Sequence, residues 1–242
     1  MFIFYRLLLA HVIADFPLQF TSIYRFKIKS LLGSFVHSGI FSLLAILLVW
    51  PYWNLTRMQE FIFFLWLVHG IQDWLKVVVC EKYRLDNIWV FLLDQSLHVG
   101  FLCLLFPFGL AKLTPPIALS KLVSLYNDNN VVIYAIAFVS IGFGGGILIY
   151  YIKNLFYGTG KVDLTSPQRY IQVFERMLIM GLMLLKGYYY LAIPGIWIIH
   201  GGYATFKKSK KRREERFRLS SLFDLILNTA IAVGIPLILR LN

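Results

Sequence analysis

The sequence is poor in cysteine and in charge. Only two of its 242 residues are cysteine, Cys80 and Cys103, and they lie far apart without a CxxC spacing. This argues against a disulfide framework and against a thiolate zinc site. Charged residues make up only 15% of the chain, whereas 59% of its residues are hydrophobic. Such a composition is typical of a polytopic membrane protein.

Several enzyme motifs are also missing. The chain has no HExxH motif and no Ser/His/Asp nucleophile arrangement. Its glycine-rich segment at 142–146 lacks the Gly-Lys-Ser/Thr ending of a phosphate loop and lies inside an apolar run, so it predicts close helix packing or a kink. Acidic residues are scarce as well, and the formal net charge is +12. We attribute the basic excess to loops that orient helices and contact anionic lipid, and we expect no nucleic-acid partner.

What the chain does contain is a series of long apolar runs, which predict an all-α, polytopic integral membrane bundle of about eight transmembrane helices. A helix needs about 20 apolar residues to cross a bilayer. Runs near this length lie at 2–20, 31–50, 58–80, 87–110, 131–153, 168–186, 188–205 and 220–240. The loop 111–130 contains two prolines, and it separates an N-terminal four-helix half, 1–110, from a C-terminal half, 131–242.

Basic residues fall in alternate loops of this predicted topology. The most basic loop, 206–219, contains the run KKSKKRREERFR. By the positive-inside rule these loops are cytoplasmic and both termini lie outside. We therefore expect an integral protein of the bacterial cytoplasmic membrane, in contact with membrane lipids.

Three of the apolar segments each carry one histidine and one aspartate spaced by a helical turn. The pairs are His11 with Asp15, His69 with Asp73, and Asp94 with His98. Four residues make about one turn, so both side chains of a pair share a helix face. In the predicted topology the aspartates and His37 lie about 7–12 Å from the cytoplasmic helix ends. Ionisable groups at membrane depth are costly and mark functional sites, so this common layer predicts a polar centre.

The donor atoms of this layer suit a metal. Imidazole and carboxylate groups without thiolates favour a divalent ion of the Zn, Mn or Fe class. The predicted ligands or their supporting partners are His11, Asp15, His69, Asp73, Asp94 and His98. Their number fits one metal, or two metals that share a carboxylate.

Other polar residues near this depth have predicted roles in catalysis or substrate binding. His37 is expected to be an additional ligand or a general base. Glu175 and Arg176, in the segment RYIQVFERMLI, are expected to be substrate-side catalytic groups. For substrate binding we expect Gln19 and Gln95 to orient an oxygen atom, and Lys76 to meet a lipid phosphate.

Three uses of the layer remain open. The leading one is a metal-dependent membrane hydrolase, or a related enzyme that processes lipids or phosphoesters, with an apolar substrate entering from the cytoplasmic leaflet. The second is a transporter or channel for a divalent cation or protons. The third is a non-catalytic membrane subunit whose polar pairs only hold helices together. No duplicated His/Asp pattern is present in the second half, which favours the enzyme over a transporter.

The chain also resembles a known family in several of these segments. They are LLLAHVIADFPLQF, HGIQD, DQSLH, RYIQVFERMLI and LSSLFDLILNTAIAVGI, together with His37. In these residues the sequence is similar to the bacterial and phage membrane proteins grouped as domain of unknown function 3307. The resemblance covers most of the chain and implies a membrane location and the same polar residues. It implies no particular activity.

Overall fold

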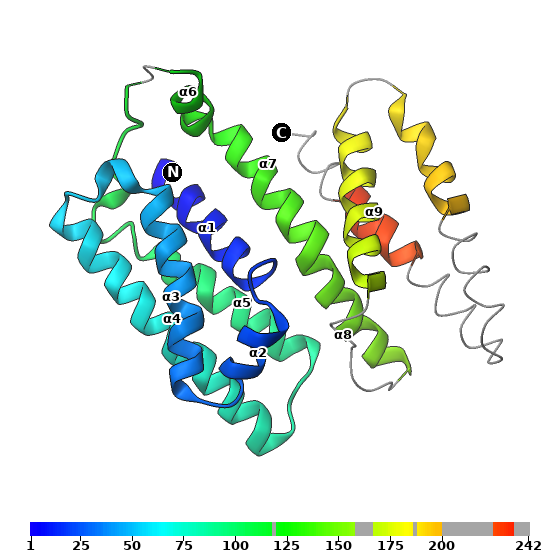
Figure 1. Cartoon of the computed structure of the whole chain (residues 1–242), viewed down its shortest axis with the longest axis horizontal. Helices are drawn as coiled ribbons and strands as arrows, with labels where there is room; N and C mark the ends of the chain where they lie inside the picture. Colours follow the sequence, from blue (N-terminus) through cyan, green and yellow to red (C-terminus); the bar gives the residue numbers. More distant parts are fainter. Residues whose placement is uncertain (118–119, 158–166, 186–187, 200–224, 235–242) are drawn as a thin grey trace. The chain divides into compact units, whose positions relative to one another are not determined.

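The structure is a computed structural model that describes residues 1–117, 120–157, 167–185, 188–199 and 225–234. In these residues the chain is helical and contains no β-strand, as predicted (Figure 1). The chain divides into two compact units, Met1–Val139 and Ser140–Asn242. The division falls after the predicted 111–130 loop, which itself contains helical turns. The predicted basic loop 206–219 lies outside the described residues.

The first unit is built around its first helix. Its elements are α1 (Phe2–Asp15), α2 (Thr21–Lys27), α3 (Leu31–Leu48), η1 (Trp50–Tyr52), α4 (Thr56–Tyr83), α5 (Ile88–Cys103), η2 (Leu110–Lys112), α6 (Lys121–Asn127) and α7 (Asn129–Val139). α1 packs against α3, α5 and α7, and most of its residues are buried (Figure 1). A helix that is apolar on every side is expected at the centre of a bundle.

Local capping determines where two helices that carry site residues begin. Ser30 precedes α3, and its Oγ accepts a hydrogen bond of 3.0 Å from the backbone N–H of Gly33. Asn87 precedes α5, and its Oδ1 accepts hydrogen bonds from the N–H groups of Trp89 and Val90. Such side chains satisfy N–H groups that have no partner in the first turn. They fix the first residue of each helix and therefore the face on which its histidine lies.

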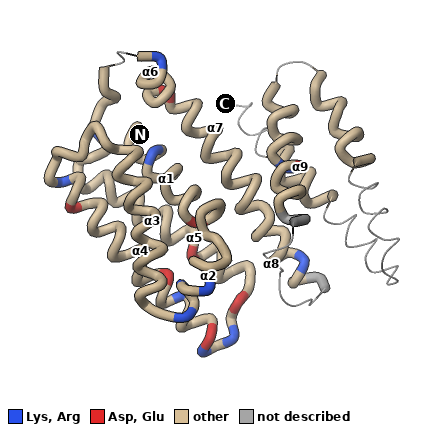
Figure 2. Tube along the Cα trace, in the orientation of Figure 1, with Lys and Arg blue, Asp and Glu red and all other residues tan. Residues whose placement is uncertain are grey.

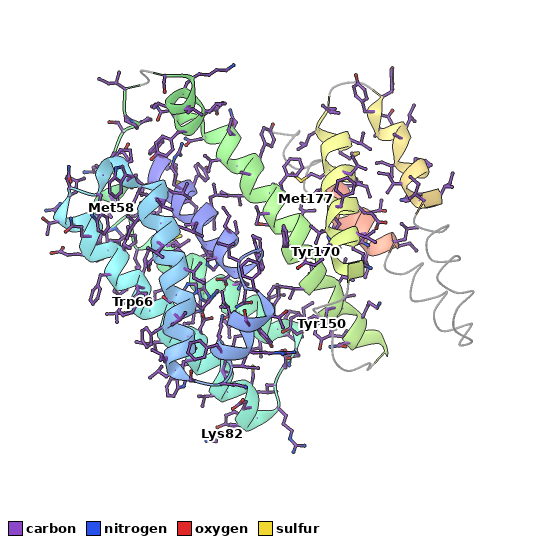
Figure 3. All side chains as sticks on the ribbon, viewed as in Figure 1. Met58, Trp66, Lys82, Tyr150, Tyr170 and Met177 are labelled. Atoms are coloured by element: carbon purple, nitrogen blue, oxygen red, sulfur yellow. The ribbon has the colours of Figure 1, made fainter. Side chains whose placement is uncertain are left out.

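An apolar core joins these helices and reaches the polar residues. Its fully buried members include Leu7, Phe41, Met58, Phe61 and Leu105. Figure 3 shows Met58, Trp66 and Lys82 spaced along α4, with Lys82 at its far end. The Phe41 ring stacks on the His69 ring with 5.2 Å between centroids. The core therefore forms one wall of the region in which the histidines lie.

A buried arginine fastens the N-terminal part of α1 to α6 and α7. Arg6 donates hydrogen bonds to the carbonyl oxygens of Phe2 and Tyr126 and to Oδ1 of Asn129. The Tyr126 hydroxyl donates to the carbonyl of Leu48 at 2.8 Å. Burial raises the pKa of Tyr126 to about 12, so the phenol stays protonated and keeps this bond at neutral pH.

The second unit contains its own buried arginine. Its described elements are the π-helix η3 (Ser140–Gly144), α8 (Gly145–Tyr157), α9 (Pro167–Leu184), η4 (Tyr189–Ala192), which continues as a helix to Ile199, and the helical segment Leu225–Gly234. Nε of Arg176, on α9, donates to the carbonyls of Ile141 and Gly142, and Nη1 donates to Oδ1 of Asn228. A Cβ added to Gly146 would lie 3.0 Å from Nη2 of Arg176. The glycine-rich segment thus permits close helix packing, as predicted.

Within the described part of the chain, three helices are long and apolar enough to cross a membrane. They are Leu31–Leu48, Thr56–Tyr83 and Asn129–Leu155. α1 has 14 residues, and its length of about 21 Å is less than the ~30 Å of a hydrocarbon core. Figure 2 shows Lys and Arg gathered around α2 and around the connection between α4 and α5. The total of about eight transmembrane helices remains a prediction.

We expect Gly33→Ala to destabilise the protein by about 1–3 kcal/mol, because the new methyl group has no space. An ideal Cβ on Gly33 would lie 2.1 Å from the carbonyl oxygen of Phe26, a backbone atom of α2. The matched control is Gly100→Ala in α5, where the added Cβ has no heavy atom within 4 Å. Better helix propensity should stabilise that variant by about 0.5–1 kcal/mol. Thermal unfolding in detergent measures both changes, and equal effects would contradict the packing of α2 on α3.

Candidate metal centre

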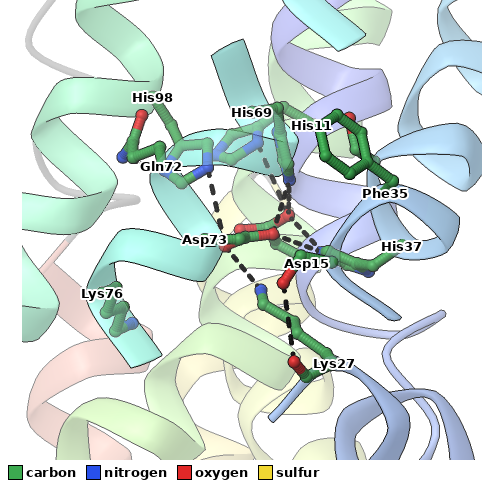
Figure 4. A network of polar contacts seen from close by, with 12 residues as sticks. His11, Asp15, Lys27, Phe35, His37, His69, Gln72, Asp73, Lys76 and His98 are labelled. Atoms are coloured by element: carbon green, nitrogen blue, oxygen red, sulfur yellow. Dashed lines mark hydrogen bonds and ion pairs between the residues drawn. The ribbon is translucent and has the colours of Figure 1, made fainter. Parts of the chain in front are cut away.

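Four helices bring the polar residues of the first unit into one buried cluster (Figure 4). Its members are His11 and Asp15 on α1, His37 on α3, His69 and Asp73 on α4, and Asp94 and His98 on α5. We call this set the His/Asp cluster. None of its residues is more than 6% exposed. Buried ionisable groups need partners, so the contacts of each aspartate define the chemistry of the site.

Asp15 lies among histidines. Its Oδ1 is 3.2 Å from Nε2 of His37, 3.4 Å from Nε2 of His69 and 3.7 Å from Nδ1 of His11. Its Oδ2 accepts a 3.3 Å hydrogen bond from Nε2 of Gln95, which was predicted to orient an oxygen atom. Among the described residues, no lysine or arginine forms an ion pair with Asp15. Its charge is therefore matched only by imidazoles and an amide.

Asp73 is paired with a lysine that sequence reasoning missed. Nζ of Lys27, on α2, lies 2.6 Å from Oδ1 of Asp73, and Lys27 is only 8% exposed. Oδ2 of Asp73 faces Nε2 of His69 at 3.3 Å. Figure 4 shows Lys27 reaching Asp73 from the side opposite His69 and His98. In the sequence Lys27 is one of several basic residues of a connecting segment, and no spacing distinguishes it from them.

Asp94 is paired with the second lysine of the site. Nζ of Lys76 lies 2.7 Å from Oδ2 of Asp94, so the lysine predicted to meet a lipid phosphate instead contacts a carboxylate. Nε2 of Gln72 donates to the carbonyl of Asp94 at 2.8 Å and lies 2.7 Å from Nδ1 of His98. Sequence reasoning missed Gln72, although its place three residues after His69 puts both on one helix face.

Four imidazole nitrogens of the cluster make no hydrogen bond. They are Nδ1 of His37 and the Nε2 atoms of His11, His69 and His98. Nε2 of His69 approaches two carboxylates, but it is not aligned for a hydrogen bond with either. The His98 ring lies 4.3 Å from the His69 ring and 5.0 Å from the His11 ring, centroid to centroid. Unpaired buried nitrogens this close together need an explanation such as a missing ion or water.

His11, His69 and His98 line a narrow pocket. Its other walls are Phe41, Leu65, Gln72, Phe101 and Leu102. Beyond the side chains it has room for about one water molecule or ion. The pocket is therefore apolar around most of its wall and polar where the imidazoles face it.

Three overlapping groups of donor atoms in the cluster could hold an ion. They are His11 with Asp15 and His69, His37 with His69 and Asp73, and Asp73 with Asp94 and His98. Within each group the donor atoms lie within 4.8 Å of one another. A lysine pairs with Asp73 and another with Asp94, whereas the polar neighbours of Asp15 are imidazole and amide nitrogens. The first group therefore fits a divalent ion best.

The other predicted residues are Gln19, Glu175 and Arg176. Gln19 follows α1 and makes no hydrogen bond or ion pair with the cluster in the described structure. Glu175 and Arg176 belong to α9 of the second unit, where both side chains are buried and Arg176 contacts backbone carbonyls. Their roles as substrate-side groups remain predictions.

Comparison with known proteins identifies one family. The family model described as "Protein of unknown function (DUF3307)" matches residues 3–125. The matched range contains the whole His/Asp cluster together with Lys27, Gln72 and Lys76. No curated protein and no solved structure matches the chain.

Replacing Lys76 and Asp94 in a double-mutant cycle should show that they are coupled. With Lys76→Met and Asp94→Asn we expect a coupling energy of about 1–2 kcal/mol, because the carboxylate is buried although the lysine is partly solvated. Lys82→Met, at the exposed end of α4, is the control and should change stability by less than about 0.5 kcal/mol. Chemical unfolding in detergent measures these values. Additive effects of the two substitutions would contradict the ion pair.

Proposed function

The chain belongs to the DUF3307 family, and we propose that it is a metal-dependent hydrolase of the membrane, acting on an ester or phosphoester of a lipid-like substrate. One observation carries the proposal. His11, His69 and His98, whose Nε2 atoms make no hydrogen bond, line a single pocket, and His69 lies 3.4 Å from the one aspartate of the cluster that has no lysine. Three membrane-length helices support the location, which we take to be the bacterial cytoplasmic membrane with about eight spans and both termini outside.

The charge of the cluster supports a cation at Asp15. Three aspartates and two lysines leave one negative charge when the histidines are neutral. An uncompensated charge in a buried site is costly. Because Lys27 and Lys76 are committed to Asp73 and Asp94, the excess charge belongs to Asp15. A divalent ion held by His11, Asp15 and His69 offsets it with donors that suit Zn, Mn or Fe.

Two further histidines support this site, His37 by orienting a ligand and His98 by accepting a proton. His37 donates from Nε2 to Oδ1 of Asp15 at 3.2 Å, which orients the carboxylate in the way that outer hydrogen bonds orient metal ligands. His37 does not line the pocket, so its role is positioning. Nδ1 of His98 lies 2.8 Å from the carbonyl oxygen of Asp94 and 2.7 Å from the amide nitrogen of Gln72, and we propose the tautomer in which Nδ1 carries the proton and donates it to the carbonyl. That tautomer leaves the lone pair of Nε2 facing the pocket, where it can accept a proton.

Hydrolysis at this site needs a water, a proton acceptor and a place for the acyl chain. When bound, a divalent ion would supply Lewis-acid activation, which brings the pKa of a water near neutrality and polarises the ester oxygen. Nε2 of His98 accepts one proton as the water oxygen bonds to carbon or phosphorus. The C–O or P–O bond then breaks, and His98 returns the proton to the leaving oxygen. The pocket has room for about one water molecule or ion, so the acyl chain of the substrate lies outside it.

We expect the purified protein to contain about one equivalent of a divalent transition metal, and Asp15→Asn to lower that content at least tenfold. The variant keeps the size of the side chain but removes the one carboxylate charge of the His/Asp cluster that no lysine matches. Elemental analysis after desalting measures the change. The same variant should lower metal-dependent hydrolysis of an acyl ester or phosphodiester reporter at least 100-fold.

The control for this experiment is Asp86→Asn, which alters an exposed aspartate between α4 and α5. It should leave both metal content and hydrolysis unchanged. Circular dichroism and gel filtration show whether each variant is folded. Wild-type protein without bound metal, or with metal that Asp15→Asn does not release, would overturn the metal site. Bound metal with no hydrolysis of either reporter class would overturn the hydrolase.

One observation favours cation or proton transit as a second candidate. The acidic and imidazole groups follow one another in short steps, from Asp15 to His69 at 3.4 Å, to Asp73 at 3.3 Å and to His98 at 3.9 Å. If this series of acidic and imidazole groups conducts ions, proteoliposomes that contain the protein should take up protons or divalent ions. Asp73→Asn should reduce that flux at least tenfold. Asp86→Asn should leave the flux unchanged. Vesicles no more permeable than empty ones would exclude this use.

A further inference from the structure

We infer that Lys27 occupies the place of a second metal ion and thereby makes the His/Asp cluster a one-metal site. His37, His69 and Asp73 have donor atoms within 4.8 Å of one another, as a metal site requires. Nζ of Lys27 lies 2.6 Å from Oδ1 of Asp73, and the lysine is buried. The inference deepens the proposed function and rests on metal binding at Asp15.

The position of Lys27 is set by the backbone of α2. An ideal Cβ on Gly33 would lie 2.1 Å from the carbonyl oxygen of Phe26, so α2 touches α3 at a glycine. Oγ of Ser34 lies 3.5 Å from the carbonyl oxygen of Lys27. These contacts hold the backbone of Lys27 against α3. From this backbone the side chain extends inward to Asp73.

The neighbours of Lys27 show that it is not a membrane-surface anchor. Arg25, Phe26 and Lys29 are exposed, as expected for side chains that meet lipid headgroups. Lys27 is 8% exposed and points the opposite way, to a buried carboxylate. Its ammonium group is therefore part of the polar centre.

The charge of this ammonium prevents a second ion from binding beside it. A divalent ion between His37, His69 and Asp73 would lie near a fixed positive charge and would meet strong repulsion in a buried site. Lys27 instead pairs with Asp73 at 2.6 Å and leaves His69 beside Asp15.

Removing the ammonium should open the second position. In Lys27→Met the side chain keeps its length and apolar stem, and Asp73 is left as a buried carboxylate that needs a cation. His37 and His69 already lie beside it, with Nε2 atoms 3.8 Å and 3.3 Å from Oδ2. Asp94 remains paired with Lys76, so only one additional ion is expected.

The test is the number of Mn²⁺ ions bound per folded chain after equilibration with Mn²⁺ and desalting. Lys27→Met should bind one equivalent more than the wild type. Lys27→Arg, which keeps the cation, and Lys29→Met, which removes an exposed one from the same segment, should bind as much as the wild type. Equal binding by Lys27→Met and wild type would overturn the inference. Wild-type protein that binds no Mn²⁺ would overturn the metal site of the proposed function and this inference with it, whereas one equivalent in both proteins would overturn the inference alone.

Electron paramagnetic resonance of the wild type tests the same point if Lys27→Met does not fold. Mn²⁺-saturated wild type should give the signal of isolated ions. Two ions that share His69 would lie close enough to give an exchange-coupled signal, which we expect only in Lys27→Met or Lys27→Gln. A coupled signal in the wild type would overturn the inference.

Discussion

Burial of three carboxylates among four helices is the constraint on which the first unit depends. Asp15, Asp73 and Asp94 are each at most 6% exposed, so every other polar group nearby serves to compensate them. Two are matched by lysines, and the third by imidazoles and one amide. The helices are held in register by this pairing as well as by apolar packing, because a shift of either partner would leave a buried charge alone.

The spacing of the His/Asp pairs allowed most of this cluster to be predicted from the sequence. A one-turn spacing places both groups on one helix face, and burial of charge drives those faces together. Lys27 could not be predicted, because its inward course depends on the contact of α2 with Gly33, which is a tertiary feature. Lys76 shows the same limit. A lysine near a helix end can extend to the lipid headgroups or pair with a buried carboxylate. For Lys76 the position of Asp94 on another helix determines which of the two occurs.

Helix lengths were harder to predict than helix faces, because hydropathy counts apolar residues whether or not the helix continues. The first apolar run extends to residue 20, but α1 ends at Asp15. Pro17 explains the difference, since a proline disfavours helical geometry at the residue before it and provides no N–H group. The early end of α1 has a structural consequence. It leaves room for the chain to reverse into α2 and to place Lys27 against Asp73.

The number of ligands in such a cluster does not by itself set the number of ions it can bind. Histidines are neutral donors at neutral pH, whereas a lysine beside a carboxylate is a permanent cation. Three donor groups overlap in the first unit, yet two of their three aspartates already carry an ammonium within 2.7 Å. Donor geometry alone therefore predicts more metal positions than the charge balance permits. In a buried site the fixed charges determine how many ions bind, because each unmatched charge costs more free energy than a vacant coordination position.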